Sequence, residues 1–262
     1  MRNSLLLLLL FLAYFCGYTQ IYSGHSHNDY AQKKPLYEAL RYGYKSIEID
    51  VWLHQGKLVV SHTKLGLNRK LSIDSLYLQP LAHIIKKNKG KLYDNKDSIP
   101  LTLMVEFKNE PSQSYARLKE YIAPYQKYFC QWQGDSLIQK GWLTILISGG
   151  APRADIEADS IRFANIDGGI SDTAQAVSNV LVPRISTYWY KYFLWNGAGP
   201  MPKDEAKTLQ KLVAAAHASG KTLRFWGAPD NYGIWKKLLN SGVDWINTNE
   251  LKPFAEYYNS RK

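Results

Sequence analysis

Short runs of apolar and β-branched residues alternate with stretches of helical periodicity along the chain after residue 20. Runs of four to eight such residues, bounded by turn residues, are typical of buried strands. A further β-rich run, Lys57 to His62, follows the turn at Gln55-Gly56, and we expect it to form a hairpin with the second strand. Eight strands are predicted, at Ile21–Gly24, Lys45–Val51, Leu101–Phe107, Trp142–Ile147, Arg162–Ile166, Leu181–Ile185, Thr222–Trp226 and Val243–Ile246.

Two of the intervening segments carry clear helix signals. The segment from about Asp204 to Ser219 places its apolar residues on one face, and Gly220 follows as a stop signal. A second helix is expected to begin near Asp230, whose side chain can cap free backbone amides, and to end before Gly242. A predicted strand follows each helix directly.

This alternation predicts an α/β fold with a parallel sheet, and eight units in about 250 residues match the size of a barrel. We therefore predict a single-domain (β/α)8 TIM barrel with a β-hairpin extension after strand 2. An open, doubly wound sheet is the alternative. No Gly-x-Gly-x-x-Gly follows an early strand and no Walker-type Lys loop occurs in the sequence, so nucleotide-binding versions of that sheet are not favoured.

The first 20 residues differ from the rest of the chain. Arg2 precedes an apolar run from Leu5 to Phe15, which is short for a bilayer span and is followed by small and polar residues. We interpret residues 1–20 as a signal peptide and residues 21–262 as the mature domain, which predicts an extracytoplasmic (secreted or periplasmic) protein. An uncleaved membrane anchor is the alternative. Cleavage would remove Cys16 and leave Cys130 as the one cysteine, so no intramolecular disulfide is expected.

Composition narrows the function classes. The chain has 262 residues, 45% hydrophobic and 21% charged, which suits one sizeable core and excludes a disordered, collagenous or coiled-coil protein. Lys and Arg number 33 against 22 Asp and Glu, and the resulting net charge of +11 attracts phosphate groups or anionic lipid surfaces. Because the basic residues are scattered and no nucleic-acid-binding module is recognisable, we expect no nucleic acid partner.

Acidic residues gather where barrel strands are predicted to end, the edge at which barrel enzymes carry their active sites. Glu48 and Asp50 are two residues apart, so on a strand both side chains point to the same side. Glu106 and Lys108 repeat this spacing on the next barrel strand. Three close carboxylates repel one another unless a hard divalent cation with oxygen ligands neutralises them. A metal site is therefore predicted; a polar barrel mouth with Lys108 paired to a carboxylate is the alternative.

Two histidines accompany these acids. His27 and His62 end different β-runs and are candidates for a general acid and a general base on either side of a substrate. His25 and His27 also form a His-x-His pair of the kind that begins some transition-metal sites. The later strands supply no further histidine for such a site, so we expect His25 to support the site from behind.

Four motifs together resemble the glycerophosphodiester phosphodiesterase and phosphatidylinositol-phospholipase-C-like barrel superfamily. They are His27-Asn28-Asp29-Tyr30, Ser46-Ile47-Glu48-Ile49-Asp50-Val51, His62 and Glu106-Phe107-Lys108. The first motif, with Arg224-Phe225-Trp226-Gly227-Ala228-Pro229-Asp230 and Trp245-Ile246-Asn247-Thr248-Asn249, looks most like the subgroup named after the fungal "altered inheritance of mitochondria six" protein. The resemblance covers nearly the whole predicted mature chain.

The resemblance implies a phosphoric diester hydrolase that uses Ca²⁺ or Mg²⁺. It places the catalytic histidines at His27 and His62, and a lysine near the substrate phosphate at Lys108. The implied metal ligands are Glu48, Asp50, Glu106 and Asn28. Substrates of the family are glycerophosphodiesters, phosphoinositides or related phospholipid headgroups, and the hydroxyl next to the phosphate commonly attacks first to give a cyclic phosphate.

The chain departs from the phosphodiesterase branch in ways that bear on substrate. That branch opens with His-Arg-Gly, whereas this chain has His27-Asn28-Asp29 and so lacks an arginine that would contact phosphate. Arg224 or Lys108 is a candidate to supply the charge instead. Trp226 and the aromatic run at 188–195 are candidates to contact the substrate or a membrane surface, or simply to pack against the barrel. A non-catalytic barrel that binds an anionic lipid or glycan is the alternative function.

Overall fold

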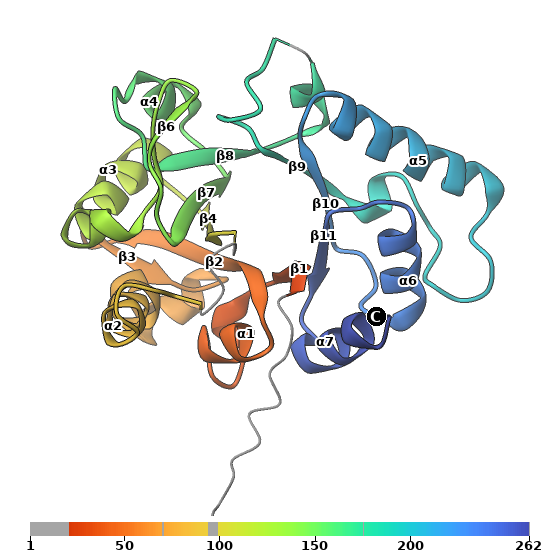
Figure 1. The fold of residues 1–262 in the computed structure, drawn as a ribbon, viewed down its shortest axis with the longest axis horizontal. Helices are drawn as coiled ribbons and strands as arrows, with labels where there is room; N and C mark the ends of the chain where they lie inside the picture. The colour runs from red at the N-terminus through yellow and green to blue at the C-terminus, as the bar shows by residue number, and fades with distance from the viewer. Residues whose placement is uncertain (1–20, 70, 94–98, 175, 262) are drawn as a thin grey trace, which may run out of the picture.

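The computed structural model describes residues 21–69, 71–93, 99–174 and 176–261; the predicted signal peptide lies outside them. Eight parallel strands form a closed barrel in the order β1-β2-β4-β7-β8-β9-β10-β11, with β11 pairing back to β1 (Figure 1). Their bounds are β1 Ile21–Ser26, β2 Tyr44–His54, β4 Leu101–Phe107, β7 Leu143–Gly149, β8 Ala164–Gly168, β9 Arg184–Tyr188, β10 Thr222–Trp226 and β11 Trp245–Thr248. The predicted (β/α)8 TIM barrel is confirmed.

Helices surround the barrel and cover the outer face of its strands (Figure 1). The apolar faces of α3 and α5 include Leu118 and Leu209, which are fully buried. The α-helices are α1 Tyr37–Arg41, α2 Gln79–Lys87, α3 Pro111–Ile122, α4 Arg153–Ala158, α5 Lys203–Ala218, α6 Tyr232–Asn240 and α7 Leu251–Ser260. Within the described residues, no helix is both long and apolar enough to cross a membrane.

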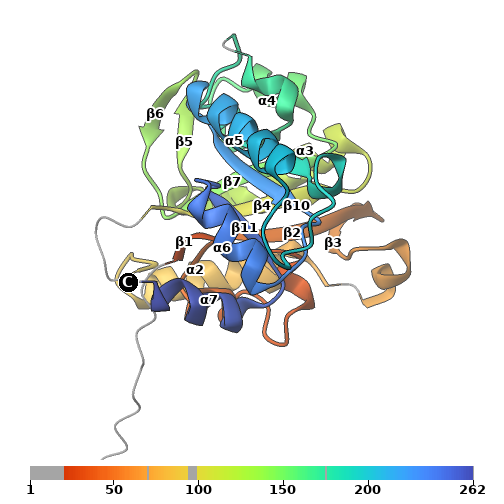
Figure 2. The ribbon, with the colours of Figure 1, turned by 90° about the vertical axis from the view of Figure 1, so that its right-hand side faces the viewer.

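Two hairpins extend the barrel at opposite ends (Figure 2). Strand β3, Lys57–Val60, pairs antiparallel with the end of β2, as the sequence predicts. The hairpin of β5, Gln131–Gln133, and β6, Ser136–Gln139, was not predicted from the sequence. It precedes β7 and therefore lies at the end of the barrel away from the carboxyl ends of the strands.

Two local predictions need correction. The sixth barrel strand begins at Arg184 rather than at Leu181, because Pro183 lacks a backbone donor and the ladder with β10 starts after it. The cap of α6 is Asn231, whose Oδ1 accepts a hydrogen bond from Ile234 N at 3.1 Å. Asp230, the predicted cap, instead binds groups at the end of β11.

Alternation along β2 separates the core from the site. Ile47, Ile49 and Val51 are fully buried between the strands and the helical layer. Glu48 and Asp50 point to the other side, into the barrel, where Glu48 meets a side chain from β10 on the far wall. This pattern places two carboxylates at the barrel mouth, as predicted.

Candidate active site

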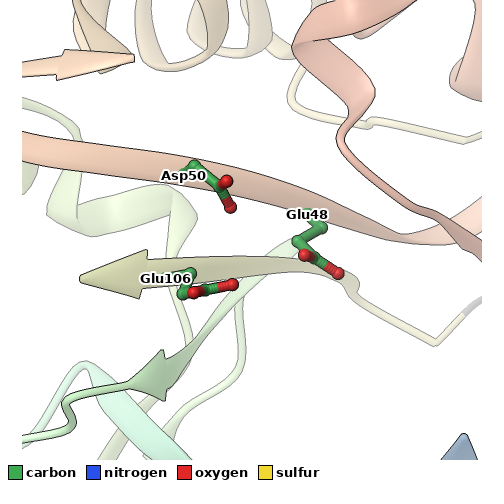
Figure 3. Close-up of side chains that lie close together, drawn as sticks. All are labelled: Glu48, Asp50 and Glu106. Carbon is green, nitrogen blue, oxygen red and sulfur yellow. The ribbon is translucent and has the colours of Figure 1, made fainter. Parts of the chain in front are cut away.

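The three predicted acidic ligands converge at the carboxyl ends of β2 and β4 (Figure 3). Asp50 and Glu106 are paired in the ladder between these strands, and one oxygen from each of Glu48, Asp50 and Glu106 lies within 4.8 Å of the others. A side chain at Gly149 would lie 2.9 Å from Glu106 Cγ, and Gly149 has a φ of +68°, so a glycine is needed beside this carboxylate.

The two oxygens of Asp50 have different surroundings. Oδ2 accepts hydrogen bonds from Tyr30, His62 and Lys108, at 2.8–2.9 Å. Oδ1 is buried and has no hydrogen-bond partner among the described residues. A buried carboxylate oxygen without a partner is costly, and a cation among the three acids would satisfy it. The residues present therefore fit a divalent metal with oxygen ligands.

Asn28 lies beside this cluster, in the left-handed region that asparagine tolerates. Its Oδ1 accepts a hydrogen bond from Tyr30 OH at 2.7 Å, and the same hydroxyl lies 2.8 Å from Asp50 Oδ2. Its role as a fourth oxygen ligand stays a prediction.

Lys108 spans two of the acids. Its Nζ donates to Glu106 at 2.6 Å and to Asp50 at 2.9 Å. Burial lowers the pKa of Lys108, but these hydrogen bonds outweigh burial and the net shift is upward. Burial also raises the pKa of Glu106, against the hydrogen bond from Lys108. The lysine therefore remains charged at the mouth of the barrel.

The two candidate catalytic histidines are held by different partners. His27 Nδ1 lies 3.0 Å from Asn249 Oδ1, an oxygen that can only accept, so Nδ1 carries the proton. Nε2 of His27 is then an acceptor, and Asn28 Nδ2 lies 3.3 Å from it. His62 Nδ1 donates to the Asp50 carboxylate at 2.8 Å, and its side chain is 63% exposed. Each ring therefore presents Nε2 for proton transfer.

His25 and Arg224 form a buried support behind Glu48. Arg224 Nη1 donates to Glu48 Oε2 at 2.7 Å, and His25 Nε2 lies 2.9 Å from the same oxygen and 2.7 Å from Arg224 Nη1. Burial and then the charge of Arg224 lower the pKa of His25 to about 3, so the ring is neutral. Burial alone would raise the pKa of Glu48, but Arg224 and His25 outweigh it and lower this pKa. Glu48 is therefore held as a carboxylate, and both nitrogens of His25 are engaged, since Nδ1 lies 2.7 Å from Ser46 Oγ.

A second polar wall, which sequence reasoning missed, lies across the cavity. Asp167, at the end of β8, accepts hydrogen bonds from Ser186 at 2.7 Å and Ser148 at 3.1 Å. Its carboxylate lies 3.7 Å from Arg224 Nη2. Burial raises the pKa of Asp167, although nearby arginines oppose it. The rule that found Glu48, a polar side chain at a strand end, would also have found Asp167.

These walls enclose a cavity of about 570 Å³ at the barrel mouth. All the predicted site residues line it except Asp50, which is fully buried. The lining residues are His27, Asn28, Glu48, His62, Glu106, Lys108, Ser148, Gly149, Asp167, Gly168, Gly169, Ser186, Arg224, Trp226 and Gly227.

The aromatic run after β9 divides between core and rim. Trp189 and Phe193 are buried and pack against one another, with ring centroids 4.2 Å apart. Tyr188 and Tyr190 are exposed, and the Tyr188 ring lies 4.4 Å from that of Trp226 at the cavity edge. Part of the run therefore packs against the barrel, and contact of the exposed part with substrate or a membrane stays a prediction.

Comparison with known proteins gives consistent matches. The family of the AIM6-like phosphodiesterase domain matches residues 18–165, a range that contains the four early motifs. The "altered inheritance of mitochondria protein 6 homolog" of Arthroderma benhamiae is 24% identical, over 89% of this chain and 83% of its own. The "altered inheritance of mitochondria protein 6" of Kluyveromyces lactis is 27% identical, over 89% of this chain and 71% of its own. A crystal structure of a glycerophosphodiester phosphodiesterase from Parabacteroides distasonis has the same fold, with a TM-score of 0.56, 15% identity and coverage of 93% and 99%.

Proposed function

The chain belongs to the AIM6-like phosphodiesterase family and is a phosphoric diester hydrolase, and we propose that it depends on a metal held by its acid cluster and that, given the signal-peptide pattern of residues 1–20, it is secreted. Its substrate is a glycerophosphodiester, a phosphoinositide or a related phospholipid headgroup, and its cofactor is Ca²⁺ or Mg²⁺. The observation that carries the proposal is Asp50 Oδ1, which is buried without a hydrogen-bond partner in the part of the chain that the structure describes. It belongs to an acid cluster beside a cavity that two oriented histidines line.

The charges at the site suit a phosphodiester. In ionised form, Glu48, Asp50, Glu106 and Asp167 carry four negative charges, against three positive charges on Lys108, Arg224 and Arg184, which is buried at the start of β9 near Asp167. A divalent ion turns the resulting single negative charge into a single positive one, and a phosphodiester monoanion then balances it. Exposed aromatic side chains at the rim support the additional proposal of peripheral membrane contact.

The hydrogen bonds of the two histidines suggest their roles. His27 is held by an uncharged amide at Nδ1 and presents an unprotonated Nε2, whose contact with Asn28 Nδ2 is a long 3.3 Å, which suits the base that takes a proton from the attacking hydroxyl or water. His62 Nδ1 donates to the Asp50 carboxylate, which orients the ring and leaves Nε2 available, and we assign it as the acid that protonates the leaving alkoxide.

In the transition state, the negative charge on the nonbridging oxygens of the substrate phosphate needs positive groups nearby. A divalent cation held by Glu48, Asp50, Glu106 and Asn28 would stabilise that charge electrostatically. Lys108 reaches the same part of the cavity and contributes a fixed ammonium. Arg224, which is paired with Glu48, acts chiefly by holding that carboxylate in place.

The test is release of a phosphodiester leaving group with EDTA, Ca²⁺ or Mg²⁺ in parallel. We expect turnover that needs a divalent ion and falls by about 10³ in His27→Ala. His83→Ala, an exposed histidine on α2, is the matched control and should keep wild-type turnover. Binding of glycerophosphodiesters or phosphoinositides without turnover in any metal would contradict the proposal and favour the non-catalytic barrel.

A further inference from the structure

We propose that Asp230 is a positioning residue for the base, and that it acts on His27 through Asn249. This inference rests on the proposed function, in which His27 is the base, and extends it to a carboxylate that is not among the described residues lining the main cavity. Asp230 ends the first of the two late motifs of the sequence, 224–230, and Asn249 ends the second, 245–249. The inference gives both motifs a role in the reaction.

The Asp230 carboxylate accepts four hydrogen bonds, and three of them come from the end of β11 and the residues that follow it. Oδ2 accepts from the backbone amides of Asn249 and Glu250, at 2.6 and 3.3 Å. Oδ1 accepts from Thr248 Oγ1 at 2.7 Å and from Trp235 Nε1 on α6 at 2.8 Å. One side chain therefore fixes the segment that follows β11.

This segment holds His27 in two ways. The backbone amide of His27 donates to the carbonyl of Thr248 at 3.1 Å, and Nδ1 of its ring donates to Asn249 Oδ1 at 3.0 Å. Gln32 Nε2 donates to the carbonyl of Asn249 at 2.9 Å. Asn249 is thus held at its N–H by Asp230 and at its C=O by Gln32, so its side-chain oxygen has a fixed place. The direction of the His27 ring follows from that place.

The position of Asp230 suits a carboxylate better than an amide. Helix α6 begins at Tyr232, two residues after Asp230, and α7 begins at Leu251, next to the Glu250 amide that Asp230 binds. Carboxylates are stabilised near the amino ends of helices, which carry a partial positive charge. A carboxylate also accepts on both oxygens, whereas an asparagine would turn its NH₂ group toward N–H donors.

The loop that carries Asp230 is fixed against the cavity wall. Gly227, which lines the cavity, has a φ of +71°, and a Cβ there would lie 2.5 Å from the Tyr188 ring. The same ring lies 4.4 Å from that of Trp226. Asp230 therefore connects the cavity wall at the end of β10 with His27 at the end of β1, across the intervening β11.

The test is a double-mutant cycle on the turnover of one phosphodiester, with Asp230→Asn, Asn249→Ala and the two combined. Asp230→Asn should lower kcat about fivefold and leave KM within about twofold, because the His27 ring is less often oriented for proton transfer. In the Asn249→Ala background the same change should lower kcat by less than about twofold, since the link to His27 is already broken.

Asp244→Asn is the matched control, because Asp244 precedes β11 at the other end of the barrel. Its Oδ2 accepts a hydrogen bond from Leu223 N at 2.8 Å and lies 2.9 Å from His217 Nε2. Asp244→Asn should lower the free energy of unfolding, as Asp230→Asn does, but leave kcat unchanged. Gln32→Ala, which frees the carbonyl of Asn249, is the second variant if Asp230→Asn folds poorly. It should lower kcat about twofold, and only when Asn249 is present.

The tautomer of His27 is measured separately, by NMR of protein labelled with nitrogen-15 in histidine, at one fixed pH. The His27→Ala protein identifies the His27 signals. We expect Nδ1 to carry the proton in wild type and in Asp244→Asn. In Asp230→Asn, rings protonated at Nε2 should also be populated, because the Asn249 acceptor has moved.

Equal losses of kcat from Asp230→Asn with and without Asn249, or an unchanged His27 tautomer in Asp230→Asn, would overturn the inference and leave the proposed function intact. Absence of wild-type turnover with Ca²⁺ or Mg²⁺ present would instead overturn the proposed function. The tautomer of His27 would then decide by itself whether Asp230 positions this ring.

Discussion

The two polar walls of the main cavity use carboxylates in opposite ways. On the β2–β4 wall, Asp50 keeps one buried oxygen without a partner among the described residues. On the β8–β10 wall, Asp167 has a serine donor on each oxygen and an arginine nearby. Both acids are buried at strand ends, so burial and position do not separate them. Their hydrogen-bond partners do separate them. The β2–β4 wall retains a carboxylate oxygen that can bind a cation, whereas both carboxylate oxygens on the β8–β10 wall already have partners within the protein.

The largest effect should come from Asp50→Asn on the acid wall. Loss of this charge should lower the affinity for Ca²⁺ and Mg²⁺ by at least about 100-fold and kcat/KM by about 10⁴, because the metal and the support of His62 are both weakened. Calorimetric titration of each ion and kinetics on one phosphodiester measure the two effects.

Asp167→Asn is the matched change on the opposite wall. It should leave metal affinity within about twofold of wild type, since Asp167 is bound to serines rather than to the acid cluster. Equal losses of metal affinity in both variants would show that the two walls do not differ in the way inferred from their hydrogen bonds.

A smaller effect is expected from the residue that holds His27. Asn249→Ala removes the acceptor for Nδ1, so kcat should fall about tenfold with KM nearly unchanged, because the ring loses its preferred tautomer and orientation. Asn249→Asp, which keeps an acceptor oxygen, should restore much of kcat and alter its pH profile. Asn88→Ala, at the exposed end of α2, is the control. A rise in KM with kcat unchanged would indicate that Asn249 contacts the substrate instead.

The sequence pattern was sufficient to predict the parts of this site that depend on one strand or on two adjacent barrel strands. The alternation along β2 places Glu48 and Asp50 on one side, and the next barrel strand brings Glu106 and Lys108 beside them. The barrel, the hairpin after β2 and the family were therefore predicted correctly. The site roles of the named residues, the signal peptide and the secreted location stay predictions.

Contacts across the barrel were not predictable in the same way. Arg224 meets Glu48 across the barrel from 176 residues away, and His27 meets Asn249, which follows the neighbouring strand β11, from 222 residues away. Alternation tells which side of a strand a residue faces, but not which residue on the far wall it meets, because this depends on the stagger of the closed barrel. The structure pairs Arg224 with Glu48 and also places it in the cavity lining, so its predicted contact with the substrate phosphate stays a prediction.

The smallest expected effect concerns stability and pH on the β8–β10 wall. Burial raises the pKa of Asp167 in the folded protein above its unfolded value. The folded state therefore binds the proton more tightly, and this contribution to stability is fully present below about pH 4 and is lost as pH rises through the folded pKa. The free energy of unfolding of wild type relative to Asp167→Asn should accordingly decrease from pH 4 to pH 7, as measured by urea unfolding. An opposite slope would mean that Arg224 and Arg184 outweigh burial, and that this wall, like Glu48, is built to hold a full negative charge.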